Sequence, residues 1–177
     1  MLPVLLALAI CLVLMIVFII GQPEEFKLVR SARMSAPPEK IFPHVNNLRL
    51  WDAWSPWAKL DPNAKNSFTG PESGVGASMS WSGNKKIGEG CMTIIASHAN
   101  QSIGFKLEFV RPFKATNTAE FEFRPAGAET VAVWSMTGKS NFFFKVFGLF
   151  MNCDEMAGKD FEKGLASLKV VVEASAN

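Results

Sequence analysis

An antiparallel β-sheet is predicted by the middle of the chain, where short alternating segments follow one another between turn clusters. Breaks rich in glycine, proline, serine and asparagine occur at 70–74, 82–85, 97–101 and 125–128. Between the breaks, apolar and charged residues alternate, as in IGFKLEF and AEFEFR. Because no helical stretch long enough for a parallel crossover interrupts this region, the strands are expected to pair antiparallel.

A long C-terminal helix is predicted from about Phe142 to Val171. Apolar residues recur there at helical spacing, and this stripe includes Phe161 and also Asp160. The stripe is expected to face the sheet. Each glycine inside a helix lowers helix stability by about 1 kcal/mol relative to alanine. The presence of Gly158 and Gly164 therefore suggests either close packing or a cavity beside the helix.

One strand and two short helices are predicted ahead of this sheet. Alternation between Phe26 and Met34 is typical of a strand, and the prolines of SAPPE favour a helix start soon after it. A second short helix is expected to carry Trp51 and Trp54 and to end at Pro56, whose ring disfavours helical geometry in the preceding residue.

The N-terminal segment MLPVLLALAICLVLMIVFII contains no charged residue. As a helix it would span roughly 30 Å, the hydrocarbon thickness of a bilayer. A cleaved signal peptide is the alternative, but a basic n-region and a small-x-small cleavage site are missing and the apolar run is long. The sequence therefore favours a transmembrane anchor over residues 1–21 and one domain over residues 22–177.

Membrane orientation is predicted from the basic residues that flank the segment. Lys27, Arg30, Arg33 and Lys40 follow it within about 20 residues, so the positive-inside rule favours a single-pass protein of the cell membrane with a cytoplasmic domain. The net charge of +2 is too small and too scattered for nucleic-acid binding.

The order of elements is that of an α+β helix-grip fold, in which a curved antiparallel sheet of about seven strands wraps a long C-terminal helix. Particular motifs carry a family resemblance: APPEKIF (36–42), WDAWSPW (51–57) with LDP (60–62), GP (70–71) with GVGA (74–77), WSGN (81–84), GEG (88–90) and GKDFEKGL (158–165). With these motifs the chain resembles the START-related SRPBCC superfamily, in its polyketide cyclase/dehydrase-like branch with an N-terminal membrane segment. The resemblance is specific for the fold and weak for function, because that superfamily hosts ligand carriers, cyclases, hydrolases and chaperone cofactors.

The resemblance implies an apolar cavity between the sheet and the long helix. Residues predicted to line it are large and apolar: Trp54, Trp81, Phe105, Phe109, Phe121, Trp134, Met136 and Phe161. For Trp54 the alternative is ordinary core packing, since large aromatic residues are mostly buried. Alternation leaves open whether the face of the strand that carries Trp134 is the face toward the cavity. The apolar run NFFFKVFGLF (141–150) suggests either a gate or membrane-dipping patch, or packing against the short helices.

Catalytic signals are sparse. Asp160 lies within an apolar stripe and Glu89 lies between two glycines on a strand, so both are candidates for an acid or base; a surface position at the edge of the stripe is the alternative for Asp160. The two histidines lack a neighbouring nucleophile, and the spacing predicts no metal and no cofactor.

The sequence favours a membrane-anchored module that binds or transfers a hydrophobic small molecule such as a lipid, an isoprenoid or an aromatic polyketide-like compound. A cyclase or dehydrase that uses Asp160 or Glu89 is one alternative, and a protein-interaction module with exposed aromatic residues is another. The expected partners are the hydrophobic ligand and the membrane, without nucleic acid, and no protein partner can be named.

Overall fold

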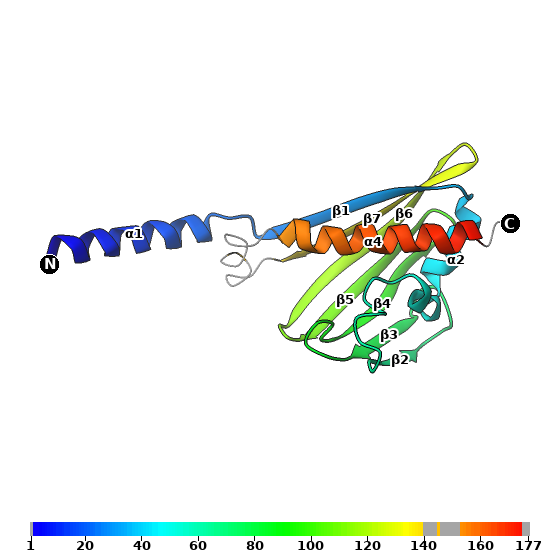
Figure 1. Cartoon of the computed structure of the whole chain (residues 1–177), viewed down its shortest axis with the longest axis horizontal. Helices are drawn as coiled ribbons and strands as arrows, with labels where there is room; N and C mark the ends of the chain where they lie inside the picture. Colours follow the sequence, from blue (N-terminus) through cyan, green and yellow to red (C-terminus); the bar gives the residue numbers. More distant parts are fainter. Residues whose placement is uncertain (1, 140–144, 146–152, 175–177) are drawn as a thin grey trace.

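The computed structural model describes residues 2–139, Lys145 and residues 153–174, and within them a single antiparallel sheet of seven strands in the order β1-β7-β6-β5-β4-β3-β2. The strands are β1 (Glu25–Met34), β2 (Lys65–Thr69), β3 (Ser78–Ser82), β4 (Glu89–His98), β5 (Ser102–Arg111), β6 (Ala115–Ala126) and β7 (Glu129–Lys139). Every neighbouring pair is antiparallel, as the short turns predicted (Figure 1).

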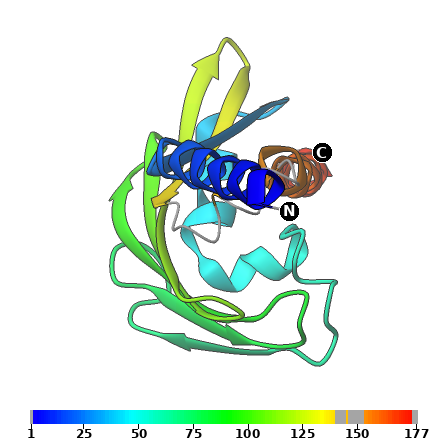
Figure 2. The ribbon, with the colours of Figure 1, turned by 90° about the vertical axis from the view of Figure 1, so that its left-hand side faces the viewer.

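Four helices accompany the sheet in the described residues: α1 (Leu2–Ile20), α2 (Pro38–Asn46), the 3₁₀ helix η1 (Leu48–Ala53) and α4 (Cys153–Ala174). The predicted order of one strand, two short helices, six strands and a long helix is confirmed. The sheet curves around α2, η1 and α4, which gives the α+β helix-grip architecture (Figure 2). The predicted helix start at Phe142 and the apolar run 141–150 lie outside the described residues, apart from Lys145.

The concave face of the sheet and the long helix share one core. Along β6 the alternation predicted from sequence places Ala119, Phe121 and Phe123 inside, with Glu120 exposed between the first two. Strand β7 lies between β1 and β6, and it has buried residues on both faces. Trp134 points to the concave side with the core, which settles the face that alternation left open.

Helix α4 presents its small residues to the sheet, as its glycines predicted. A Cβ atom on Gly164 would lie 2.8 Å from the Trp134 ring and 3.0 Å from the Pro56 ring. A Cβ atom on Gly158 would collide with the guanidinium of Arg30, which crosses the helix there to reach Glu162. Both glycines therefore serve close packing, so a cavity is not required to explain them.

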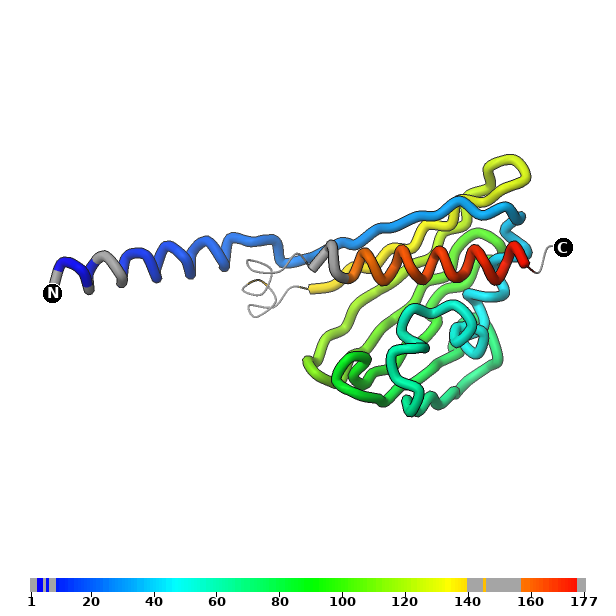
Figure 3. The backbone as a smooth tube through the Cα atoms, viewed as in Figure 1, coloured from blue at the N-terminus to red at the C-terminus, as the bar shows by residue number. Residues whose placement is uncertain are grey.

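Helix α1 extends away from the domain ahead of β1 (Figure 3). Its 19 residues include no charged side chain, and the described large apolar side chains from Val4 to Phe18 are exposed. Over the described residues, however, no helix reaches the combined length and apolarity of a membrane span. The transmembrane anchor expected for residues 1–21 is therefore not supported by the structure, although the segment does form a helix.

Candidate functional site

Burial of the concave face decreases along β5, β6 and β7 toward the end from which α1 leaves. Across the middle strands, the register aligns Ile103, Phe121 and Trp134 in a fully covered row. Toward the end from which α1 leaves, the next row holds Met136 beside the buried Phe105, and the row after it holds Leu107. Met136 and Leu107 are only half-buried. We call this part of the concave face the open end, and it comprises the half-buried residues Trp81, Leu107, Phe109 and Met136 together with the more deeply buried Asn117.

Five of the eight predicted cavity residues form a closed aromatic core. These are Trp54, Phe105, Phe121, Trp134 and Phe161, and each is at most 3% exposed. Trp134 stacks on Phe161 with ring centroids 3.9 Å apart and on Phe121 at 4.8 Å. Because these rings fill the space between the sheet and α4, the ligand cavity expected along their whole length is replaced there by packed core.

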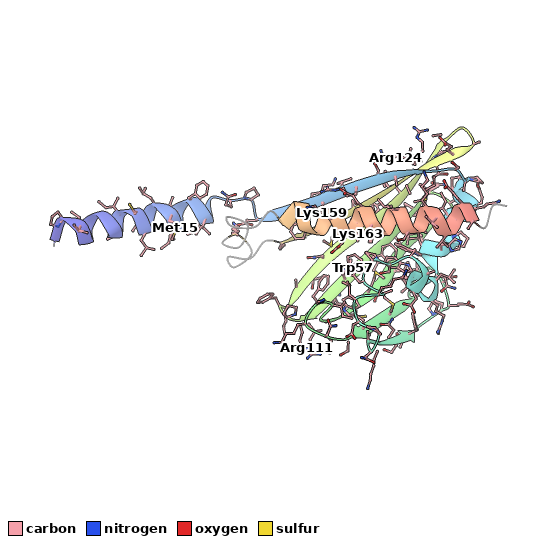
Figure 4. The ribbon with its side chains drawn as sticks, in the orientation of Figure 1. Met15, Trp57, Arg111, Arg124, Lys159 and Lys163 are labelled. Carbon is pink, nitrogen blue, oxygen red and sulfur yellow. The ribbon has the colours of Figure 1, made fainter. Side chains whose placement is uncertain are left out.

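The tryptophan-rich stretch 51–57 packs into this same core. Trp51 Nε1 donates to the carbonyl oxygen of Val45 at 2.9 Å, and Trp54 Nε1 donates to that of His44 at 3.0 Å. Both indoles are therefore satisfied within the protein, which is how a buried indole N–H is usually accommodated. Trp57 is half-buried beside Trp134 and Phe161 and flanks the core (Figure 4).

The other three predicted residues, Trp81, Phe109 and Met136, lie at the open end. The Trp81 and Phe109 rings meet edge to face, with centroids 5.8 Å apart. Trp81 lies over Gly90, where a Cβ atom would come within 2.5 Å of the ring, and its Nε1 donates to the Ile87 carbonyl oxygen at 3.1 Å. These contacts hold a large apolar wall in place while leaving part of it uncovered.

Asn117 is the polar member of the open end, and sequence reasoning missed it. Its side chain is 9% exposed, and Nδ2 donates to Sδ of Met136 at 3.8 Å, which is a weak acceptor. The amide lies across Gly138, where a Cβ atom would collide with Oδ1. The sequence does contain a signal for it, because alternation places Asn117 on the same inward face of β6 as Ala119 and Phe121.

The two candidate carboxylates do not face the open end. Asp160 is paired with Lys163, whose Nζ lies 3.2 Å from Oδ1, and its side chain is 37% exposed. Glu89 is paired with Arg111 at 2.7 Å on the other face of the sheet from Gly90. The pairing of β4 with β5 has a register shift between Glu89 and Gly90. Neither carboxylate therefore lies in the dry cavity site expected of a candidate acid or base.

A hollow of about 330 Å³ lies on the outer face of β2, β3 and β4, and sequence reasoning missed it. Its lining includes Lys65, Ser80 and Cys91. Cys91 Sγ lies 3.1 Å from Ser78 Oγ. Burial raises the pKa of the Cys91 thiol, but hydrogen bonds from Ser78, Ser80 and Thr93 lower it more, so the pKa lies below its usual value.

This hydroxyl cluster predicts how Cys91 reacts. In a Cys11→Ser, Cys153→Ser chain, Ser78→Ala is expected to move the pH midpoint of Cys91 alkylation upward, because the thiolate loses its nearest donor. The midpoint is read from alkylation rates followed by mass spectrometry across pH. Ser67→Ala is the matched control, since Ser67 lines the same hollow but is not one of the three residues that hydrogen-bond Cys91. Equal midpoints for Ser78→Ala and the parent would contradict the assignment.

Comparison with known proteins extends this description at the level of fold. No family model matches the chain, and no curated protein matches it. Among solved structures, MLL2253 from Mesorhizobium loti superimposes with a TM-score of 0.62 at 16% identity, over 84% of this chain and 98% of that one.

Two further solved structures are similar. CV1439 from Chromobacterium violaceum has a TM-score of 0.59 at 14% identity, over 86% of this chain and 99% of its own. Ara h 8.0201 also gives 0.59, at 12% identity, over 85% of this chain and 99% of its own. At such identities the likeness concerns architecture alone, and it shows that the domain has the helix-grip fold.

Proposed function

We propose that the protein binds a hydrophobic small molecule at the open end of its concave face. The observation that carries this proposal is the gradient of burial along the sheet, which leaves Trp81, Leu107, Phe109 and Met136 half-buried beside a closed core. An apolar surface with a few fixed polar groups is typical of sites for small ligands. The superfamily that the sequence resembles includes ligand carriers, which agrees with this function.

The chemistry of the open end favours a ligand with an apolar body and one polar atom. The aromatic and aliphatic side chains supply the apolar contact, while the Asn117 amide supplies one donor and one acceptor. A lipid, an isoprenoid or an aromatic polyketide-like compound fits this description. Because Asp160 and Glu89 are engaged in surface ion pairs, we do not propose catalysis by them.

We further propose that α1 tethers the domain to the cell membrane, with the domain on the cytoplasmic side. The support is the uncharged sequence of α1 and the exposure of its described apolar side chains, which is costly in water. The basic residues that follow α1 favour the cytoplasmic side. Alkaline extraction of membranes tests the tether: retention in the pellet is expected, and release into the supernatant would contradict it.

Ligand binding is tested by native mass spectrometry of the full-length protein in detergent, together with titration of a fluorescent apolar probe. A stoichiometric co-purifying ligand is expected. Phe109→Ser is expected to weaken probe binding about tenfold or more, since removing a phenyl ring from an apolar contact forfeits roughly 1.5–3 kcal/mol. Phe105→Asp is unsuitable as a test, because Phe105 lies in the closed core and its replacement would disturb folding.

Ile95→Ser is the matched control, because Ile95 is an exposed apolar residue on the neighbouring strand β4, in the half nearer the opposite end of the sheet. Its probe affinity is expected to equal that of the parent. Asn117→Leu is expected to bind the apolar probe with unchanged affinity. Its affinity for ligands with a polar atom is expected to fall about five- to tenfold, the equivalent of one hydrogen bond. Equal binding by Phe109→Ser and Ile95→Ser would place the ligand elsewhere.

A further inference from the structure

The register of the sheet brings seven strand termini together at the end from which α1 leaves. Glu25 at the start of β1 pairs with Lys139 at the end of β7, and Glu89 at the start of β4 pairs with Arg111 at the end of β5. Lys65, at the start of β2, pairs with the last residue of β3. We call this side of the domain the α1 end, and it is also where the concave face is least covered.

Exposed cations concentrate at the α1 end. Six lie in its strand termini and turns: Lys65, Lys85, Lys86, Arg111, Lys114 and Lys139. The same termini and turns hold three carboxylates outside the interior, Glu24, Glu25 and Glu89, of which Glu89 is paired with Arg111. We call the six cations the basic rim.

At the opposite end of the sheet two carboxylates pair with cations. Arg33 pairs with Glu129 at 2.9 Å and Arg124 with Glu122. Figure 4 labels Arg124 on that side and Arg111 on the side of α1. The domain is therefore polarised, with its positive surface directed toward the helix that carries the exposed apolar residues.

The β5–β6 turn adds an apolar tip to the basic rim. Val110 and Phe113 are 47% and 56% exposed, and they are flanked in sequence by Arg111 and Lys114. Apolar side chains between cations are typical of segments that rest in the interface of an anionic bilayer. The geometry beside α1 is also fixed, because Lys145 Nζ donates to the carbonyl oxygens of Ile20 and Gln22 at 3.3 and 2.7 Å.

The turn that carries Lys85 and Lys86 is held rigidly toward the same side. The buried Asp61 carboxylate accepts a hydrogen bond from the Asn84 backbone N–H at 2.7 Å. Asn84 Oδ1 in turn accepts one from the Lys86 backbone N–H at 2.8 Å. The Gly83 N–H donates to the Gly88 carbonyl oxygen at 2.9 Å and closes the turn. The two lysines thus project from a preorganised loop, which reduces the entropy lost when they bind.

We propose that the basic rim and the Val110–Phe113 tip dock on the surface of an anionic bilayer, with Phe113 at the acyl boundary and the cations on lipid phosphates. This inference rests on the proposed tether, because α1 determines which end of the domain faces the membrane. Docking in this way turns the open end of the concave face toward the lipid surface. An apolar ligand then passes between the bilayer and the site without crossing bulk water.

The test uses the full-length chain in vesicles, with Cys11, Cys91 and Cys153 replaced by serine and Phe113→Cys labelled with an environment-sensitive fluorophore. Vesicles contain spin-labelled lipid as a quencher and either phosphatidylcholine alone or equal parts of phosphatidylcholine and phosphatidylglycerol. We expect strong quenching with phosphatidylglycerol and a reduction of about twofold or more when Lys85 and Lys86 are both changed to glutamate. Val75→Cys is the matched control, because Val75 is 60% exposed in the β2–β3 turn at the opposite end and is expected to escape quenching.

Flotation of the same vesicles separates the two proposals. Protein that floats with its label at residue 113 unquenched overturns the docking while leaving the tether in place. Equal quenching at residues 113 and 75, or equal quenching in both lipid mixtures, also overturns it, because orientation or charge then plays no part. Protein that does not float at all overturns the tether and the docking together. Probe binding at the open end is measured independently in detergent.

Discussion

Trp134→Ala is expected to lower the free energy of unfolding by about 3–5 kcal/mol, the usual loss for a large aromatic residue removed from a core. Trp134 is 3% exposed and stacks between Phe121 and Phe161, so its removal leaves a hole that links the sheet to α4. Neither neighbouring ring can collapse into the hole without leaving its own contacts. In thermal unfolding, this loss corresponds to roughly 6–20 °C in Tm for a domain of this size.

The change is measured by denaturant unfolding of the detergent-solubilised full-length chain, followed by circular dichroism. Trp57→Ala is the control, because Trp57 contacts the rings of Trp134 and Phe161 but is only half-buried, so a clearly smaller loss of stability is expected. A loss below about 1 kcal/mol for Trp134→Ala would contradict a closed aromatic core. It would instead favour the continuous cavity that the sequence suggested.

Gly90→Ala is the second large effect, with an expected loss of about 1–3 kcal/mol from overpacking. A Cβ atom at this position would lie 2.5 Å from the Trp81 ring and 2.7 Å from the backbone oxygen of Glu108. The indole can turn away, but the backbone of β5 cannot move without disrupting its ladder. The displaced Trp81 would also leave the open end, so the affinity for an apolar probe is expected to fall together with stability.

Gly104→Ala is the matched control for this substitution. Gly104 lies in the neighbouring strand β5, and the nearest atom to an added Cβ would be the Ala96 Cβ at 3.3 Å, a contact that a small shift relieves. Unfolding and probe titration are compared for the two variants. If Gly90→Ala is as stable as Gly104→Ala and binds the probe equally well, the contact between Trp81 and Gly90 does not shape the open end.

Much of the fold followed from local patterns, because alternation and turn residues act over a few neighbours. The β6 residues Ala119, Phe121 and Phe123 were identified as one face from their spacing alone, and they are buried together. The site was harder to predict. Alternation places Phe105 and Phe109 on the same face of β5, yet the first is fully buried and the second half-buried. The difference depends on how far α4 and η1 reach along the sheet.

The sequence by itself determined the order of elements, the antiparallel sheet and the helical character of residues 2–20. Tertiary structure decided which aromatic residues are core, that Gly158 and Gly164 serve packing, that Arg30 pairs with Glu162, and that Asn117 lies on the open end. The physical reason is distance along the chain. Periodicity reports which face a residue occupies, whereas burial and charge pairing depend on elements far apart in sequence, such as β1 and α4, that meet only in the folded domain.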